Sequence, residues 1–567
     1  MNTVEQWKQE KHPLDVIEDV KRYAREGLSF EEITNASDGG EFERLKWAGM
    51  YTHGTHDDYY MVRTKVPGGL LTPEQARVVG EVATEFATAP EEHGGAEQNP
   101  VWGDAYLDIT TRQDIQMHWI EIEDVPEIWD RYDEVGLTTI QGCGDSARNV
   151  LGCPVAGVAD HEAFDAQPVV DAISDFFTEN REYGNLPRKF KLTVTGCRQD
   201  CAQSQINDIG LTPAKKRLDG EWQYGFHAKV GGGLSDGPRM ASELDVFIPP
   251  EDAVEFTRAV AQTFKELGDR QNRGVCRMRY LVEQLGPERF EEAVRDRSPL
   301  DFPTRGVDLT EGYTGDHVGV HDQRDGLNYV GFNVIAGRMG GDEFIAAARA
   351  AETYGTDDAT IRLATDQNFV ITHIPDENVG ALLSEPFART YRPNPGPFSR
   401  GAVGCTGSEF CTYGIIETKQ RVRRWAKALD RRIDTPDDLD VVRMHMSGCS
   451  ASCAQPQIAD IGFRGETVKL DDPERTKNDE GDAIVEGMDF GLGGSLGLDN
   501  EFLDWVETAV PADAVIPALE QLFAAFAEER HEGERFYNWC RRVENDRLRA
   551  IMQDADANVS GGVAHGD

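Results

Sequence analysis

An internal duplication is the feature that most limits what this chain can fold into. The segment 195–210 recurs as 447–462, with the same Gly-Cys-x-x-x-Cys-Ala-Gln run and the same Asp-Ile-Gly ending. Cys197 and Cys449, like Cys201 and Cys453, lie 252 positions apart. Residues 110–120 match 364–374 more loosely at nearly the same separation. We therefore expect two similar halves that arose by gene duplication and fusion.

The periodicity of apolar residues predicts helices and strands in both halves. Residues 106–120 and 360–374 alternate apolar and polar side chains, as half-buried strands do. Helical spacing covers residues 72–86, 343–354 and 512–529, and Thr72, Pro73 and Gln75 open the first of these as a capping box. This order predicts a mixed α/β architecture with pseudo-twofold symmetry. Residues 303–315 are the expected linker between the halves.

Charge excludes some classes of partner. The chain has 101 acidic and 58 basic residues in 567, a net charge of −43. Acidic residues dispersed in this way suit a high-salt cytoplasm, where screening removes their mutual repulsion. No basic stripe is present to neutralise phosphates, which argues against nucleic acid. We find no run of eighteen apolar residues and no signal-peptide core, so a cytoplasmic protein is expected.

Four of the ten cysteines have the spacing of a metal centre. Cys405 and Cys411 are separated by five residues, and Cys449 and Cys453 by three. Four thiolates can hold a [4Fe–4S] cluster, one at each iron corner. Tetrahedral zinc is the alternative for four cysteines, but its usual Cys-x-x-Cys knuckles are missing. The four residues are therefore predicted to be cluster ligands.

The two cysteine motifs and the segment Ile415-Ile-Glu-Thr-Lys419 resemble the nitrite/sulfite reductase family, and the resemblance covers nearly the whole chain. It implies α/β mixed sheets in a duplicated, three-domain architecture. The implied domains are a ferredoxin-like domain (1–125 plus 305–385), a siroheme and substrate domain (126–304) and a cluster and siroheme domain (386–567). It also implies that the Cys453 thiolate is shared between the [4Fe–4S] cluster and a siroheme.

The same resemblance assigns site residues. Siroheme has eight carboxylates and the substrates are oxyanions, so basic residues are expected around both. The residues implied for binding and protonating the substrate are Arg63, Arg148, Lys189 and Lys191. Those implied for binding siroheme are Arg112, Gln116, Arg188 and Gln367, together with Cys453.

The substrate expected from the motifs is sulfite. Lys189-x-Lys191, Cys143 and Tyr51 match the sulfite-type pattern, although nitrite reduction to ammonia at the same site is the alternative. No nucleotide-binding glycine motif is evident, so ferredoxin is the expected electron donor, docking on a local arginine group such as 421–424. A precorrin-modifying enzyme and a non-catalytic electron carrier are further alternatives. The precorrin-modifying enzyme would not need the full set of four basic residues, and an electron carrier rarely needs two duplicated halves.

Cys197 and Cys201 depart from the family pattern. The family's first half usually has no such pair, because its equivalent site holds no cofactor. With Cys143 and Cys153, these thiols could form a second cluster, but buried free thiols are the expectation. Cys276 and Cys540 are expected to pack in the interior.

Overall fold

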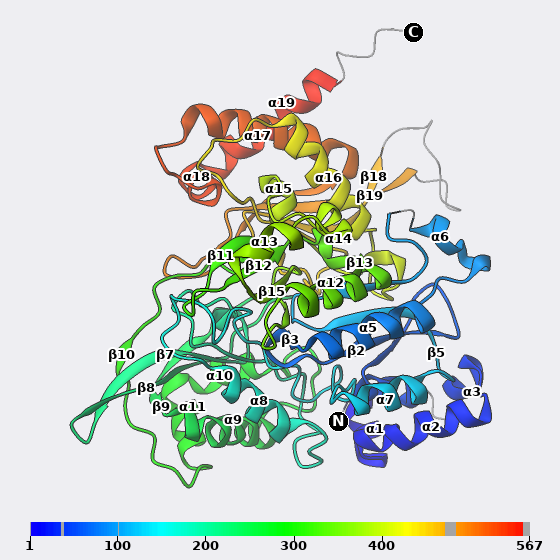
Figure 1. Cartoon of the computed structure of the whole chain (residues 1–567), viewed down its shortest axis with the longest axis vertical. Helices are drawn as coiled ribbons and strands as arrows, with labels where there is room; N and C mark the ends of the chain where they lie inside the picture. The colour runs from blue at the N-terminus through cyan, green and yellow to red at the C-terminus, as the bar shows by residue number, and fades with distance from the viewer. Residues whose placement is uncertain (1, 36–38, 100, 471–482, 560–567) are drawn as a thin grey trace. The chain divides into compact units, whose positions relative to one another are not determined.

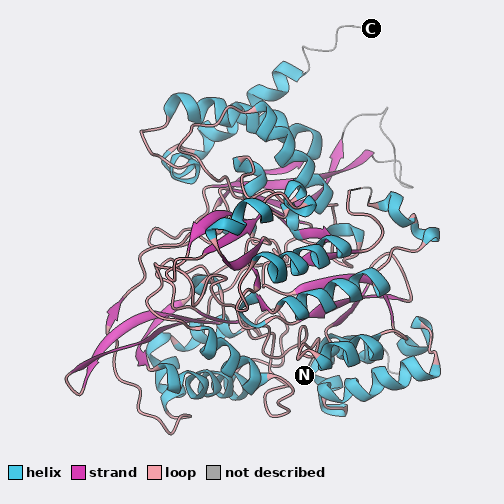
Figure 2. Ribbon diagram, viewed as in Figure 1, coloured by secondary structure: helices cyan, strands magenta, loops and turns pink. Residues whose placement is uncertain are grey.

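The computed structural model describes residues 2–35, 39–99, 101–470 and 483–559 (Figure 1). The chain divides into two compact units. The first comprises Met1–Gly233, Pro238–Val334 and Arg338–Pro393, and the second comprises Leu234–Gly237, Ile335–Gly337 and Asn394–Asp567. Both units mix helices with sheets (Figure 2), so the predicted α/β class is confirmed.

Two five-stranded sheets of the first unit exchange a strand between the halves of the chain. The first has the order β1 (Met50–Thr52), β2 (Tyr59–Thr64), β5 (Ile115–Glu121), β4 (Tyr106–Ile109) and β13 (Arg338–Gly340). The second has the order β11 (Gly319–Asp322), β12 (Asn328–Phe332), β15 (Phe369–Ile374), β14 (Ile361–Leu363) and β3 (Leu70–Leu71). Each half thus supplies the edge strand of the other half's sheet, which ties distant parts of the chain together.

Helices α5 (Pro73–Phe86) and α12 (Gly341–Tyr354) run side by side (Figure 1). Glycines permit this close approach, because a Cβ atom on Gly80 would lie 2.6 Å from Ile345 Cγ1. The predicted capping box of α5 is confirmed. The Thr72 hydroxyl accepts the Gln75 N–H at 3.1 Å, and the Gln75 side chain accepts the Thr72 N–H at 2.9 Å.

The remaining two sheets also repeat each other. In the first unit, β10 (Val307–Asp308), β7 (Ile209–Leu218), β8 (Glu221–Val230) and β9 (Ser242–Ile248) form a row, and β6 (Leu192–Val194) pairs in parallel with β7. In the second unit the order is β16 (Ala402–Gly404), β17 (Met444–Ser447), β18 (Ile461–Leu470), β19 (Ala483–Leu492) and β20 (Asp504–Pro511). β7 and β18 start 252 positions apart, as the cysteine pairs do. The duplication is therefore visible in strand pairing.

Other helices cover these sheets. In the first unit they are α1 (Thr3–Glu10), α2 (Val16–Glu26), α3 (Phe30–Asn35), α4 (Gly40–Leu45), α6 (Gly95–Gln98), α7 (Val125–Glu134), α8 (Gln167–Phe177), α9 (Ala253–Leu267), α10 (Met278–Leu285), α11 (Pro287–Arg295), α13 (Asp376–Leu382) and α14 (Pro386–Thr390). In the second unit they are α15 (Pro397–Arg400), α16 (Lys419–Arg432), α17 (Val515–Glu529), α18 (Phe536–Arg542) and α19 (Asn545–Val559). Among the described residues, no helix is long and apolar enough to cross a membrane.

Two sequence expectations need correction. Residues 106–120 and 360–374 each fold as a hairpin, and their strands are almost wholly buried rather than half-buried. The alternation is real, since Leu107 and Met117 enter the apolar core, but the polar face with Asp108, Gln116 and His118 is also shielded from solvent. The expected linker 303–315 contains β10, which pairs with β7.

Candidate active site

The buried polar face of β2 and β5 begins the candidate site. Arg63 on β2 lies opposite Gln116 on β5, and its Nη2 atom donates to Gln116 Oε1 at 2.5 Å. Its Nη1 atom lies 3.3 Å from Cys143 Sγ and 3.4 Å from the Gly142 carbonyl oxygen. The Arg63 guanidinium also lies 5.8 Å from the centre of the Tyr51 ring. Arg63 therefore contacts Gln116, Cys143 and Tyr51, all three of which were singled out from the sequence.

The loop after Gly142 brings a second arginine to the same carbonyl. Arg148 Nη1 donates to the Gly142 oxygen at 2.6 Å, and its Nε atom donates to the Gly144 oxygen at 3.1 Å. Gly144 has a φ of +88°, and a Cβ atom there would lie 2.7 Å from the Trp47 ring. Only glycine fits such a tight turn, so Gly144 fixes where Arg148 sits.

Arg112 lies in the turn between β4 and β5. Its Nη1 atom donates to Asn207 Oδ1 at 2.8 Å, and Nη2 donates to the Asn149 carbonyl at 2.7 Å. Burial lowers the pKa of Arg112 to about 10. The negative charge of Asp114 opposes this shift, and the positive charge of Arg148 adds to it. Burial raises the pKa of Asp114 to about 6, although Arg63, Arg112 and Arg148 all favour its charged form.

Lys189 and Lys191 precede β6 rather than lying within a strand. Burial lowers the pKa of Lys191 well below its ordinary value, and the charges of Arg112, Lys189 and Arg277 lower it further. Asp208 opposes this shift, accepting the Lys191 backbone N–H at 2.9 Å and lying 3.2 Å from Arg277. Lys191 therefore loses its proton more readily than an exposed lysine.

The basic residues outnumber the acids around them. Among the described residues linked by these electrostatic interactions, the acids are Asp114 and Asp208, and the bases are Arg63, Lys65, Arg112, Arg148, Lys189, Lys191 and Arg277. Burying like charges together is unfavourable unless a counter-ion binds. The cluster therefore fits an anionic ligand, and a polycarboxylate with a small oxyanion would supply the missing negative charge.

Two of the residues predicted to bind siroheme, Arg188 and Gln367, contact other parts of the protein. Arg188 pairs with Asp145 at 3.2 Å, and Asp145 also accepts from Arg273 at 2.5 Å and from Lys8 at 3.4 Å. Gln367 Nε2 donates to the Ile109 carbonyl at 2.9 Å, while Gln113 Nε2 donates to the Leu363 carbonyl at 2.8 Å. The two glutamines make reciprocal contacts between the duplicated hairpins, so both help to hold the hairpins together.

The predicted cluster ligands lie on two adjoining loops of the second unit. Cys405 follows β16, and its sulfur accepts the Gly448 N–H at 3.1 Å. The loops pack through glycine, because a Cβ atom on Gly448 would lie 3.1 Å from Gly407 Cα. Burial raises the pKa of Cys405 to about 12, and the charges of Cys453 and Cys411 add to this. Cys411 and Cys449 likewise feel the charge of Cys453. The four thiols thus form one electrostatic group on loops that can approach a cofactor closely.

Several residues of the site were not predicted from the sequence. Arg277, Asp208 and Asn207 were missed, although Asp208 belongs to the duplicated Asp-Ile-Gly run. Its counterpart Asp460 accepts the Arg443 backbone N–H at 2.7 Å, just as Asp208 accepts that of Lys191. The repeated aspartate was therefore an available signal. Cys276 and Cys540 are buried as predicted.

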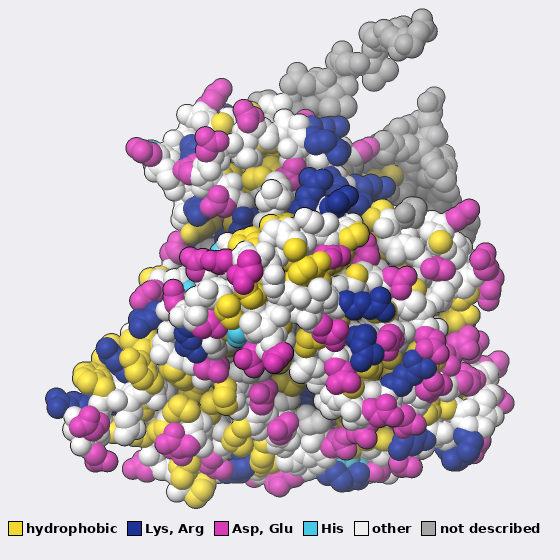
Figure 3. Space-filling view, in the orientation of Figure 1, with side chains coloured by type: hydrophobic (Ala, Val, Ile, Leu, Met, Phe, Trp, Pro, Cys, Tyr) yellow, Lys and Arg dark blue, Asp and Glu magenta, His cyan; other side chains and the backbone are white. Residues whose placement is uncertain are grey.

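Only part of the arginine group 421–424, predicted to dock the electron donor, is exposed. Arg421 is buried and pairs with Glu486, so it cannot form an exposed docking residue. Arg424, Arg431 and Arg432 on the same helix are exposed. Basic side chains gather on the surface over α16 (Figure 3). A smaller basic patch than expected is therefore present on α16.

Comparisons with known proteins agree with this geometry. Residues 143–302 and 396–558 match the nitrite and sulphite reductase 4Fe-4S domain, and residues 51–135 and 321–388 match the nitrite/sulfite reductase ferredoxin-like half domain. An assimilatory ferredoxin-dependent nitrite reductase of Haloferax mediterranei is 38% identical, covering 97% of this chain and 95% of that protein. A ferredoxin sulfite reductase of Mycolicibacterium paratuberculosis is 33% identical, covering 97% and 96%. The solved NirA protein of Mycobacterium tuberculosis superposes with a TM-score of 0.85 at 33% identity, covering 97% of each chain.

Proposed function

Because the chain belongs to the nitrite and sulfite reductase family, we propose that it is a ferredoxin-dependent assimilatory sulfite reductase, reducing sulfite to sulfide with six electrons. The observation that supports this best is the buried group of basic residues around Lys191, next to the Arg63, Cys143 and Tyr51 contacts. Lys189, Lys191, Cys143 and Tyr51 are the residues that favour sulfite.

The family uses siroheme and a [4Fe–4S] cluster. The four thiols on glycine-lined loops suit the cluster, with Cys405, Cys411, Cys449 and Cys453 as ligands and Cys453 as the one shared with siroheme. The excess of buried positive charge suits the siroheme carboxylates, which Arg112, Gln116, Arg188 and Gln367 would bind. When bound, these groups supply electrons to the substrate one at a time.

The chain's own residues would bind the anion and supply protons. Arg63 and Arg148 both donate to the Gly142 carbonyl, so their guanidinium groups are held in fixed positions and their positive charge would attract an oxyanion. Lys189 and Lys191 add positive charge. Because the Lys191 pKa is lowered, its ammonium group is a stronger acid than usual and can protonate a leaving oxygen. Each oxygen of sulfite leaves as water, so Lys191 would have to recover a proton from solvent between successive protonations.

Anion binding should weaken as the pH rises. Below its lowered pKa, Lys191 is charged and attracts the anion, and above that pKa the charge is lost. Bound anion favours the charged form, so binding takes up a proton. We expect the Kd for nitrite, which itself does not titrate near neutral pH, to increase with pH in spectral titrations made below the ordinary pKa of lysine, about 10.4. The Lys191→Met variant should show a flatter dependence, and an equally steep one would contradict this role.

The basic surface of α16 supports ferredoxin as the donor. Arg424, Arg431 and Arg432 are exposed there, and ferredoxins are acidic. Opposite charges would steer the two proteins together, more strongly at low salt. This patch is small within a strongly acidic chain, which suits a transient complex rather than a permanent one.

Nitrite reduction to ammonia is the second candidate, favoured by the 38% identity to the Haloferax nitrite reductase. Purified protein with about five irons per chain, one in siroheme and four in the cluster, should be assayed with reduced ferredoxin and each anion. A higher kcat/KM for sulfite supports the proposal. A higher value for nitrite would reverse the assignment, and protein without siroheme would exclude both.

A further inference from the structure

Three buried thiols of the first unit converge. The Sγ atoms of Cys153, Cys197 and Cys201 lie within 4.8 Å of one another, and 3.5 Å separates those of Cys197 and Cys201. Cys143 is not part of this group, so the four-thiol cluster considered from the sequence does not form. Among the described residues, these three cysteines are the only His, Cys, Asp or Glu group with such spacing. The predicted cluster ligands of the second unit are spaced more widely.

These thiols repeat three of the four cluster positions. Cys153, Cys197 and Cys201 precede Cys405, Cys449 and Cys453 by 252 positions each. The fourth ligand, Cys411, corresponds to Ala159, two residues before His161. The first half therefore keeps three thiols and an imidazole where the second half has four thiols.

Backbone contacts hold His161 beside Cys197. Glu162 and Cys197 form an antiparallel bridge, and the Ala163 N–H donates to the Gly196 carbonyl at 2.8 Å. A Cβ atom on Gly196 would lie 1.9 Å from the Phe164 carbonyl oxygen, so this approach requires glycine. The Nε2 atom of His161 is buried and has no hydrogen-bond partner among the described residues, so it is available as a ligand. A fourth ligand is thus held next to the thiols.

A buried arginine supplies charge opposite to that of thiolates. Arg362 on β14 donates to the Ala156 carbonyl at 2.5 Å, within the loop that follows Cys153. Burial lowers the pKa of Arg362 to about 10, and the charge of Cys153 opposes this shift. A divalent ion with three thiolates and a neutral imidazole carries one net negative charge, which Arg362 would balance.

The spacing of the sulfurs distinguishes a single ion from a cluster. Tetrahedral zinc, with Zn–S bonds of about 2.3 Å, places its sulfurs about 3.8 Å apart, whereas cluster thiolates bind separate irons and lie further apart. We propose that Cys153, Cys197, Cys201 and His161 bind one zinc ion in a structural site. The thiols release their protons to solvent as the ion binds, and no electron is transferred.

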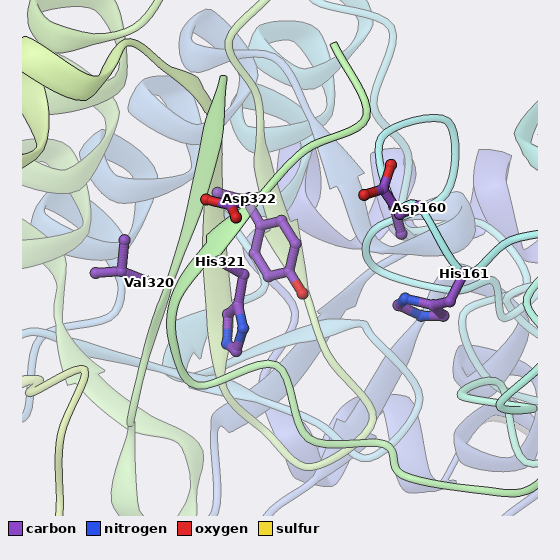
Figure 4. Close-up of a pocket in the computed structure, with 7 residues that line it drawn as sticks. Asp160, His161, Val320, His321 and Asp322 are labelled. Carbon is purple, nitrogen blue, oxygen red and sulfur yellow. The ribbon is translucent and has the colours of Figure 1, made fainter. Parts of the chain in front are cut away.

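A cavity of about 350 Å³ lies beside this group. Figure 4 shows Asp160 and His161 on one side and His321 and Asp322 on the other. Tyr329 lines the cavity and also packs in the same apolar cluster as the three cysteines. An ion in this cavity would therefore meet His161 directly.

Metal analysis of the holoenzyme tests the proposal. We expect one zinc per chain beside the iron, and a zinc-edge X-ray absorption spectrum with three sulfurs at about 2.3 Å and one nitrogen at about 2.0 Å. Cys201→Ser and His161→Ala should lower zinc occupancy at least tenfold after chelator treatment. The Cys276→Ser variant should keep its zinc, because Cys276 does not belong to this group of thiols. Its thiol is buried elsewhere and donates to the Arg273 carbonyl at 3.0 Å.

Two results would overturn the zinc site, and a third would replace one of its ligands. Wild-type protein that neither contains nor takes up zinc excludes it. About nine irons per chain without zinc would indicate a second [4Fe–4S] cluster instead. Loss of zinc in His317→Ala but not in His161→Ala would reject His161 as the ligand. Buried His317 is the other candidate, since its Nε2 atom has no hydrogen-bond partner in the part of the chain that the structure describes and its ring also feels the charge of Cys197. The wild-type measurements need no variant, so a variant that fails to fold leaves the test intact.

Discussion

The Lys191→Met variant should reduce sulfite with a kcat/KM lower by about 10²–10⁴-fold, the usual contribution of a general acid. The change removes a proton donor whose pKa is lowered by burial and by Arg112, Lys189 and Arg277, and it keeps most of the side-chain volume. Steady-state rates with reduced ferredoxin, together with the visible spectrum for siroheme content, give the measurement. Full siroheme loading is required for the comparison.

Lys215→Met is the matched control, because Lys215 lies on β7 over the Trp222 ring at 5.2 Å and contacts no predicted site residue in the interactions described. Its activity should stay close to that of the wild type. If the Lys191→Met variant retained the wild-type kcat/KM with siroheme bound, Lys191 would not be the proton donor. A loss confined to KM would assign Lys191 to anion binding alone.

Replacing Arg338 by methionine should lower the free energy of unfolding by about 3–5 kcal/mol, because it removes the guanidinium group that pairs with the buried Asp108 carboxylate. Arg338 Nε donates to Asp108 Oδ1 at 2.7 Å and Nη2 to Oδ2 at 3.0 Å, and both side chains are at most 1% exposed. The pair joins β13 from the second half to β4 from the first, so its loss should loosen the exchanged edge strand.

Urea unfolding of matched samples at high salt checks this expectation. Arg131→Met is the control, since Arg131 forms ion pairs with Glu85 at 2.6 Å and Glu127 at 2.7 Å on the surface. That change should alter stability by less than about 1 kcal/mol. The double variant Arg338→Met with Asp108→Leu should recover part of the loss. If Arg338→Met and Arg131→Met lowered the free energy of unfolding equally, burial of the ion pair would not explain its contribution.

Much of the fold could be predicted because its signals are local or repeated. The capping box at Thr72 depends on residues three apart, and the helix that it starts was placed correctly. Cysteine spacing and the repeated Asp-Ile-Gly run identified the duplication, which strand pairing then confirmed. The hairpins at 106–120 and 360–374 were less clear, because alternation does not tell whether a polar face meets solvent or a buried site.

The family, the duplicated architecture and the spacing of the cluster cysteines could be inferred from residue order alone, because they depend on short spacings. Which side chains meet became clear only in the folded chain. The tertiary structure brought Arg277 to Lys191 and buried Arg421, and it separated Cys143 from Cys153, Cys197 and Cys201. It also exchanged β3 and β13 between the halves. The physical reason is that burial and charge interactions depend on distances across the fold, which residue order alone does not fix.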